Sequence, residues 1–209
     1  MTATAKTLSP NDYVVNIAGE AVRLPVLPAS DTLAIALLMV IDMGVKFGER
    51  VGAALAEKTG YLQPDIVVGP ATLGIPVTIE VTRQFGLDDY VILQKSPKIH
   101  LADAMAREVE SVTSAGSQRI LLDRRAVPLL EGRRVLVVDD VVATGSSLAA
   151  SIALVRDAGA YVVGVGTILT EGHSWRDTLG TDAELIHELG HIPQFRVDGN
   201  VANVIPETL

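Results

Sequence analysis

The sequence predicts an α/β fold with a central, mostly parallel sheet covered by helices on both faces. Short runs of apolar, largely β-branched residues recur along the chain, separated by stretches of helical length, as in right-handed βαβ units. The 209 residues are 48% hydrophobic but only 4% aromatic, so the core must be aliphatic, as in a parallel sheet buried on both faces. No linker or internal repeat breaks this pattern, so we interpret residues 1–209 as a single domain.

The N-terminal part is expected to contain little regular structure before one long helix. Residues 1–30 are punctuated by prolines and contain one short predicted strand at Tyr13–Ile17. Ser30 is typical of a helix cap. The helix is predicted from about Thr32 to Thr59, and Gly60 ends it.

Strands and helices then alternate. The predicted strands are Asp65–Val68, Tyr90–Leu93, Arg119–Leu122, Arg134–Val138, Tyr161–Leu169 and Glu184–His187. The predicted helices are Ile75–Phe85, Leu148–Ala158 and His173–Leu179. Residues 95–118 have no strong periodicity, and both a broken helix and a mobile loop fit them. Because ligands bind at the carboxyl ends of parallel strands, the loops that follow the strands are where function is expected.

Composition excludes several classes of function. The net charge of -8 argues against a general attraction to nucleic acid. The chain has no cysteine, which excludes disulfides and thiolate chemistry, and its four scattered histidines do not predict a metal cage. The apolar run Leu33–Ile41 is about half a membrane span, and Met1–Pro10 lacks a signal-peptide pattern. We therefore expect a cytoplasmic protein that binds neither membrane nor nucleic acid.

The strongest functional signal is a pair of acids that follows an apolar strand. Val135–Val138 leads directly to Asp139 and Asp140. In an extended chain two adjacent side chains point in opposite directions, so we expect the chain to begin turning at these acids. Carboxylates at this edge can accept hydrogen bonds from vicinal hydroxyls, as on a ribose, or help to hold a hydrated cation.

Small and hydroxyl residues come next, immediately before a predicted helix. They are Ala143, Thr144, Gly145, Ser146 and Ser147. Successive backbone amides in such a turn form an anion-binding concavity, and the helix N-terminus adds partial positive charge. The same residues would also suit a simple capped junction between strand and helix. A phosphate beside a diol held by carboxylates, however, describes ribose 5-phosphate.

The segment Val135–Ser147 resembles, at every position, the motif with which type I phosphoribosyltransferases bind 5-phosphoribosyl-1-pyrophosphate (PRPP). Within this family the chain looks most like the adenine and xanthine (purine) enzymes. The resemblance implies that Asp139 and Asp140 bind the ribose hydroxyls as the catalytic acids, and that residues 143–147 hold the 5-phosphate. It also implies Mg²⁺ as cofactor, with no protein residue assigned as its ligand, and a homodimer.

A second loop resembles the pyrophosphate loop of the same family. This loop is Gly69–Gly74, which follows a predicted strand. The corresponding loop of the family often contains an unusual peptide geometry. The resemblance assigns pyrophosphate binding to Ala71, Thr72, Leu73 and Gly74. Taken alone, a Gly-Pro loop between a strand and a helix is more often only a turn.

Lysines and apolar residues complete the predicted site. Lys95 and Lys98 follow the strand Tyr90–Leu93 and could supply point charges to pyrophosphate, with Lys95 nearest the strand end. Val141, Val142 and Phe195 are the candidates to contact the base. Further candidates for base contacts are Glu171, Trp175 and Ile192–Phe195.

The family resemblance also implies a division of labour along the chain. Residues 60–170 form the PRPP-binding core, while residues 1–30 and 171–209 form a hood over the base. Residues 100–118 stand where the family keeps a loop that closes over the substrate and excludes water.

The predicted function is transfer of the phosphoribosyl group from PRPP to a purine base, with release of pyrophosphate. Two alternatives remain open. One is a PRPP-binding transcriptional regulator of the same fold, although neither an added DNA-binding segment nor a basic face is evident. The other is an orotate-type (pyrimidine) enzyme, because Gly69–Pro76 also resembles the orotate enzymes' pyrophosphate loop.

Overall fold

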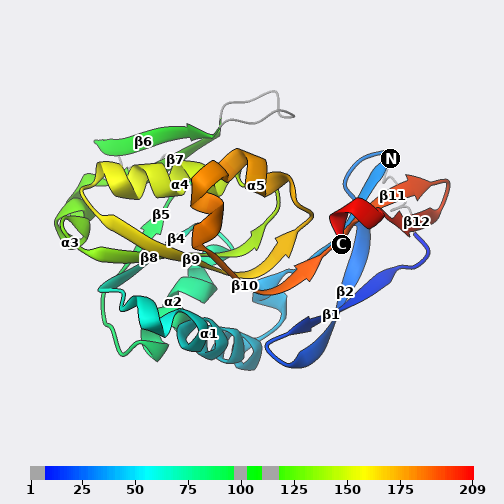
Figure 1. Ribbon diagram of the computed structural model, residues 1–209, viewed down its shortest axis with the longest axis horizontal. Helices are drawn as coiled ribbons and strands as arrows, with labels where there is room; N and C mark the ends of the chain where they lie inside the picture. Colours follow the sequence, from blue (N-terminus) through cyan, green and yellow to red (C-terminus); the bar gives the residue numbers. More distant parts are fainter. Residues whose placement is uncertain (1–7, 97–102, 110–117) are drawn as a thin grey trace.

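The structure is a computed structural model, and it describes residues 8–96, 103–109 and 118–209. Its main body is a five-stranded sheet in the order β10-β9-β8-β4-β5, and every neighbouring pair is parallel (Figure 1). The strands are β4 (Ile66–Pro70), β5 (Tyr90–Leu93), β8 (Arg134–Val142), β9 (Tyr161–Glu171) and β10 (Ile186–Ile192). The predicted fold class is confirmed.

Helices cover both faces of this sheet (Figure 1). One face is packed by α1 (Val45–Thr59) and α2 (Gly74–Gln84), and the other by α4 (Ser146–Asp157). Successive side chains of a strand point to opposite faces, so Val138 packs in the core of α1 and α2 and Val137 in the core of α4. The shorter helices are α3 (Val127–Leu130) and α5 (Ser174–Leu179).

The order of the strands reverses between β4 and β8. The chain passes from β4 outward to β5 at one edge, and then returns to β8 on the other side of β4. At such a switch point the loops after the two central strands diverge to opposite faces and leave a crevice at their carboxyl ends. The loops that follow β4 and β8 are therefore placed side by side.

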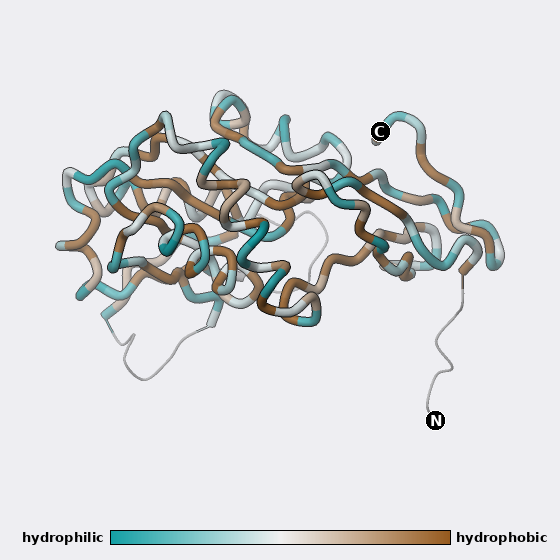
Figure 2. Tube along the Cα trace, turned by 90° about the horizontal axis from the view of Figure 1, so that it is seen from below, coloured by the Kyte–Doolittle hydropathy of each residue, from teal (hydrophilic) through white to brown (hydrophobic). Residues whose placement is uncertain are grey.

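A second, antiparallel sheet extends the molecule along its long axis (Figures 1 and 2). Its strands are β1 (Asp12–Ile17), β2 (Glu20–Pro28), β3 (Leu33–Ala36), β11 (Gln194–Asp198) and β12 (Val201–Val204). The order is β1-β2-β3-β11-β12, so β3 and β11 join segments from opposite ends of the chain. Its buried residues, among them Ile17 and Leu24, belong to the same core as α1 and α2.

The long helix predicted for residues 32–59 is wrong in nearly its first half, residues 32–44. Leu33–Ala36 forms β3, which alternates in burial and pairs with strands on both sides. The helix begins only at Val45, after Gly44 with a φ of 82°. Ser30 does cap backbone amides, but they are those of Thr32 and Leu33 in a turn. Pairing with distant strands therefore overrides the local helical tendency of this segment.

Other predicted elements differ in extent. β8 continues to Val142, so the two acids lie within the strand and not in a turn. Residues 104–109 form β6 (Ala104–Val109), where a broken helix or loop was expected, and they pair with β7 (Gln118–Asp123). β6 also packs over α4. Across the described ranges, no helix is both long and apolar enough to cross a bilayer.

Candidate functional site

A polar cavity of about 160 Å³ opens at the carboxyl edge of the parallel sheet. The two acids, both valines predicted to contact the base and most of the predicted phosphate loop line it. Its lining residues are Lys95, Asp139, Asp140, Val141, Val142, Ala143, Thr144, Gly145, Ser147 and Leu148. Of the loop residues 143–147 only Ser146 is not among them; it faces a separate hollow beside Arg107 and α4.

The two acids differ in their surroundings. Asp139 is 7% exposed and accepts a hydrogen bond from the backbone amide of Asp140 at 2.9 Å, whereas Asp140 is half-buried. A Cβ atom added to Gly74 would lie 3.1 Å from Oδ1 of Asp139. The carboxylate of Asp139 therefore lies against the start of α2, and the loop after β4 meets the acids of β8.

Burial and crowding disfavour negative charge on Asp139. Burial raises the pKa of Asp139 well above its usual range, and the neighbouring charge of Asp140 raises it further. Lys95 opposes this rise in pKa by its positive charge. Hydrogen-bond donors or a cation brought by a ligand would relieve the cost of ionising this pair.

The phosphate-loop candidate ends in a left-handed glycine. Gly145 has a φ of 80° and is the N-cap of α4, and it supplies no side-chain cap to the first turn. The amide of Ser146 is bonded to the hydroxyl of Thr144 at a long 3.4 Å. Because a helix leaves its first amides without intrahelical partners, this turn can accept an anion.

The loop after β4 is shaped by close backbone packing. A side chain at Gly69 would overlap the hydroxyl of Thr78 and come within 3.0 Å of the carbonyl oxygen of Val138, so only glycine fits there. Ala71 is buried, and its amide donates to the carbonyl of Leu93. The peptide bond between Ala71 and Thr72 is cis, an unusual geometry of the kind that the family resemblance implied for this loop.

The remaining pyrophosphate candidates range from exposed to buried, and one lies outside the described residues. Thr72 is exposed and Leu73 half-buried, and Gly74 begins α2. Lys95 is exposed and follows Gln94, which pairs with Leu121 of β7 and so fixes the end of β5. Lys98 lies outside the described residues, as do residues 100–102 and 110–117 of the predicted closing loop.

Several base-contact candidates lie in the core and not at the cavity. Phe195 is 1% exposed and packs edge-on against Tyr13 in the second sheet, which leaves no face for a base, so this prediction is corrected. Trp175 is 2% exposed and packs beneath the phosphate loop. Glu171 is buried and accepts a hydrogen bond from Gln194 at 3.0 Å, and burial raises its pKa.

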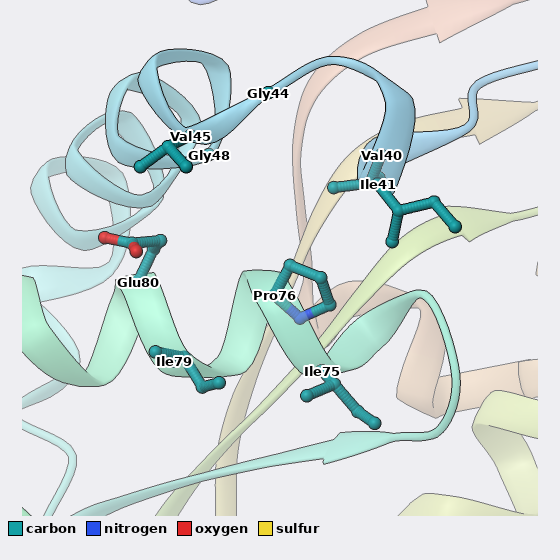
Figure 3. Close-up of a pocket in the computed structure, with 9 residues that line it drawn as sticks. All are labelled: Val40, Ile41, Gly44, Val45, Gly48, Ile75, Pro76, Ile79 and Glu80. Atoms are coloured by element: carbon teal, nitrogen blue, oxygen red, sulfur yellow. The ribbon is translucent and has the colours of Figure 1, made fainter.

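A larger, apolar groove of about 350 Å³ lies elsewhere, between the start of α1 and the first turns of α2 (Figure 3). Its lining residues are Val40, Ile41, Gly44, Val45, Gly48, Ile75, Pro76, Ile79 and Glu80. Glu80, its only acid, is paired with Arg83 at 3.2 Å. Such a lining lacks the paired acids and the lysine that line the polar cavity.

The polar cavity offers two carboxylates as possible ligands of Mg²⁺. Within the described part of the chain, no cluster of three or more histidines, cysteines and acids could form a metal cage. Mg²⁺ commonly binds through one or two carboxylates together with substrate phosphates and water. Asp139 and Asp140 fit that role, because the ion's charge would favour ionisation of the buried carboxyl.

Comparison with known proteins agrees with this geometry. The phosphoribosyl transferase domain family matches residues 43–198. An orotate phosphoribosyltransferase of Caldanaerobacter subterraneus subsp. tengcongensis is 35% identical over 59% of this chain, but the match spans only 53% of that enzyme. A xanthine phosphoribosyltransferase of Exiguobacterium sp. is 30% identical over 72% of this chain and 77% of its own length.

The fold has close structural relatives as well. The adenine phosphoribosyltransferase of Thermoanaerobacter pseudethanolicus superposes with a TM-score of 0.64 over 81% of this chain and 95% of its own, at 21% identity. The strand order, the twin acids and the family match together define the class. The chain belongs to the phosphoribosyl transferase domain family, as the motif at residues 135–147 indicated.

One contributor to the site could not be found from the sequence. Helix α5 packs directly beneath the phosphate loop, and its place there depends on contacts between residues thirty positions apart. The hydroxyl of Thr167 in β9 likewise donates to the carbonyl of Asp140 in β8. No local pattern signals either contact.

Proposed function

We propose that this protein transfers the phosphoribosyl group of PRPP to a nitrogen base and releases pyrophosphate. A ring nitrogen of the base forms a bond to the anomeric carbon as the bond from that carbon to pyrophosphate breaks, and the nitrogen's proton leaves to solvent. The observation that carries the proposal is a single cavity that combines twin acids, a lysine and an anion-binding turn.

Each part of PRPP has a counterpart in the site. Asp139 and Asp140 would accept hydrogen bonds from the ribose hydroxyls, and the amides of residues 143–147 would hold the 5-phosphate. Residues 71–74 and Lys95 would bind the leaving pyrophosphate. Catalysis would then come mainly from positioning and from stabilising charge on the leaving group.

Mg²⁺ is proposed as the cofactor, held by Asp139 and Asp140 together with substrate oxygens, and it would neutralise charge on the pyrophosphate. The carboxylates themselves orient the ribose. Val141 and Val142 border the cavity, and they remain the proposed apolar contacts of the base.

We propose a purine as the acceptor. The xanthine phosphoribosyltransferase of Exiguobacterium aligns over 77% of its length, whereas the orotate phosphoribosyltransferase of Caldanaerobacter aligns over 53% of its length. The orotate relative is nevertheless the more identical of the two, at 35%. A pyrimidine acceptor is therefore the second candidate.

The test is a pyrophosphate-release assay with PRPP, Mg²⁺ and each of adenine, hypoxanthine, guanine, xanthine, orotate and uracil. The proposal expects turnover with one or more purines and tight, Mg²⁺-dependent PRPP binding in calorimetry. Turnover with orotate alone would select the second candidate. PRPP binding without turnover on any base, accompanied by binding to nucleic acid in a gel shift, would identify a regulator and overturn the transferase assignment.

We also propose that residues 1–209 act as a single domain and that two copies form a homodimer. The second sheet has the order β1-β2-β3-β11-β12, so strands from the two proposed hood segments, β1 and β2 on one side and β11 and β12 on the other, share one sheet through β3. Ile41 and Val45, on the apolar groove, are 56% and 81% exposed. Exposed aliphatic side chains beside an apolar groove are the feature on which the proposed dimer contact rests. Analytical ultracentrifugation would measure the mass in solution, and a monomer at every concentration would contradict the dimer.

A further inference from the structure

The start of α5 is in direct contact with the phosphate-loop candidate. A Cβ atom added to Gly145 would lie 3.1 Å from the carbonyl oxygen of Trp175 and 3.2 Å from its Cα and Cβ atoms. The hydroxyl of Ser174 donates to the carbonyl of Ala143 at 3.4 Å. Two successive residues of α5 therefore touch two residues of the loop, and the backbone of Trp175 forms the surface on which Gly145 rests.

The indole of Trp175 holds the start of α5 in place. Its Nε1–H donates to the carbonyl of Gly172 at 2.9 Å, and its side chain is 2% exposed in the core that α4 also buries. The guanidinium of Arg176 lies 4.3 Å from the ring centroid on the outer side. The amide of Gly172 donates to the carbonyl of Ile192, which connects the residues just before α5 to the end of β10.

The other anion loop does not share this support. Residues 71–74 lie between β4 and α2, and α2 packs in the core on the opposite face of the sheet from Trp175. A change at Trp175 can therefore displace residues 143–147 and leave the start of α2 in place. This separation gives the two loops different sensitivities to the same substitution.

We infer that Trp175 is a positioning residue for the proposed 5-phosphate site. It holds the backbone amides of residues 143–147 in position through the contacts that the start of α5 makes with Gly145 and Ala143. The inference rests on the proposed function. Backbone donors bind an anion well only when they are held in position beforehand, and a displacement of about 1 Å can cost up to about 100-fold in function. Trp175 touches no reacting atom.

The test compares two ligands that report on the two loops separately. Calorimetry would measure ribose 5-phosphate and Mg²⁺-pyrophosphate binding to the wild type, Trp175→Leu and Trp175→Phe. We expect Trp175→Leu to weaken ribose 5-phosphate binding about tenfold and to leave pyrophosphate binding within about twofold. Trp175→Phe keeps a buried aromatic ring but loses the N–H donor, so it should bind ribose 5-phosphate more tightly than Trp175→Leu and less tightly than the wild type. It also provides the measurement if Trp175→Leu does not fold.

The matched control is Leu130→Ala. Leu130 of α3 is fully buried in the same core as Trp175, and it is neither in the phosphate loop nor in the cavity lining. This variant should melt earlier yet bind ribose 5-phosphate as the wild type does. The inference is overturned if both tryptophan variants bind ribose 5-phosphate like the wild type, or if they lose affinity for the two ligands equally. Failure of the wild type to bind PRPP at all would instead remove the proposed function, and the inference with it.

Discussion

The apolar groove and the polar cavity differ in both size and chemistry. The groove between α1 and α2 measures about 350 Å³ and is lined almost entirely by aliphatic side chains. The cavity at the end of β8 measures only about 160 Å³, yet two acids, a lysine and the amides of a helix start converge on it. Size alone would select the groove, whereas the convergence of polar groups selects the cavity.

Electrostatics favours the smaller hollow as the candidate site. Asp139 is 7% exposed beside a second acid, and burial raises its pKa well above the usual range. Such an arrangement costs stability and so indicates a functional site. In the groove, by contrast, the single acid Glu80 already has a basic partner in Arg83. The predictions below separate the two hollows, from the largest expected effect to the smallest.

The largest effect is expected from the acids of the cavity. The double substitution Asp139→Asn and Asp140→Asn should lower kcat/KM for PRPP by about 100-fold to 1,000-fold, because the ribose hydroxyls lose their charged acceptors. Pyrophosphate release measures the loss, and circular dichroism verifies the fold. Asp198→Asn, at the far end of β11, is the control that should retain full activity. Wild-type kinetics in the double variant would move the site away from this cavity.

A smaller effect is expected from the lysine of the cavity. Lys95→Gln should raise KM for PRPP about tenfold at low salt, since one positive charge beside the pyrophosphate is lost, and the difference should shrink as salt is added. Lys46→Gln is the matched control, because Lys46 is exposed on α1 beside the apolar groove. Equal changes in KM for both variants would show that Lys95 acts only through net charge.

The pH dependence of stability offers a third comparison. Because the pKa of Asp139 is higher in the folded chain than in the unfolded one, the folded state binds more protons between the two pKa values. The free energy of unfolding should therefore fall as pH rises from the ordinary aspartate range through the raised pKa. Asp139→Asn should remove that fall and melt later at neutral pH, by about 2–4 °C for each kcal/mol relieved.

Urea titrations across pH measure this directly. The apolar groove supplies the control, because Ile79→Val changes a half-buried side chain without altering any charge. That variant should keep the wild-type slope of stability against pH. A fall as steep in Asp139→Asn as in the wild type would show that the raised pKa belongs to another group.

The smallest effect on binding is expected at the groove itself. Val45 is 81% exposed, and Val45→Lys should change PRPP affinity by no more than about twofold, as exposed substitutions usually do. If two copies meet on this face, the added charge should also shift the protein toward monomer in ultracentrifugation. A large loss of PRPP affinity at constant mass would mean that the groove, and not only the cavity, belongs to the substrate site.

Residues 60–170 show how far local pattern reaches. Tyr90–Leu93 is a strand with the predicted bounds, and α2 and α4 lie within two residues of their predicted ends. The predicted phosphate loop and the acids do line one cavity. These features depend on neighbours in sequence: apolar periodicity sets the strands and helices, and a small-residue turn before a helix exposes its amides.

Contacts between distant residues decided the rest. The sequence by itself determined the parallel α/β body, the family and the loop that carries the twin acids, because strand, turn and helix propensities act over a few residues. Only the tertiary structure decided that Leu33–Ala36 becomes a strand beside β11, that Phe195 is core and that Trp175 lies beneath Gly145. The raised pKa of Asp139 is likewise decided by the tertiary structure, because burial and the proximity of charges depend on how the molecule packs.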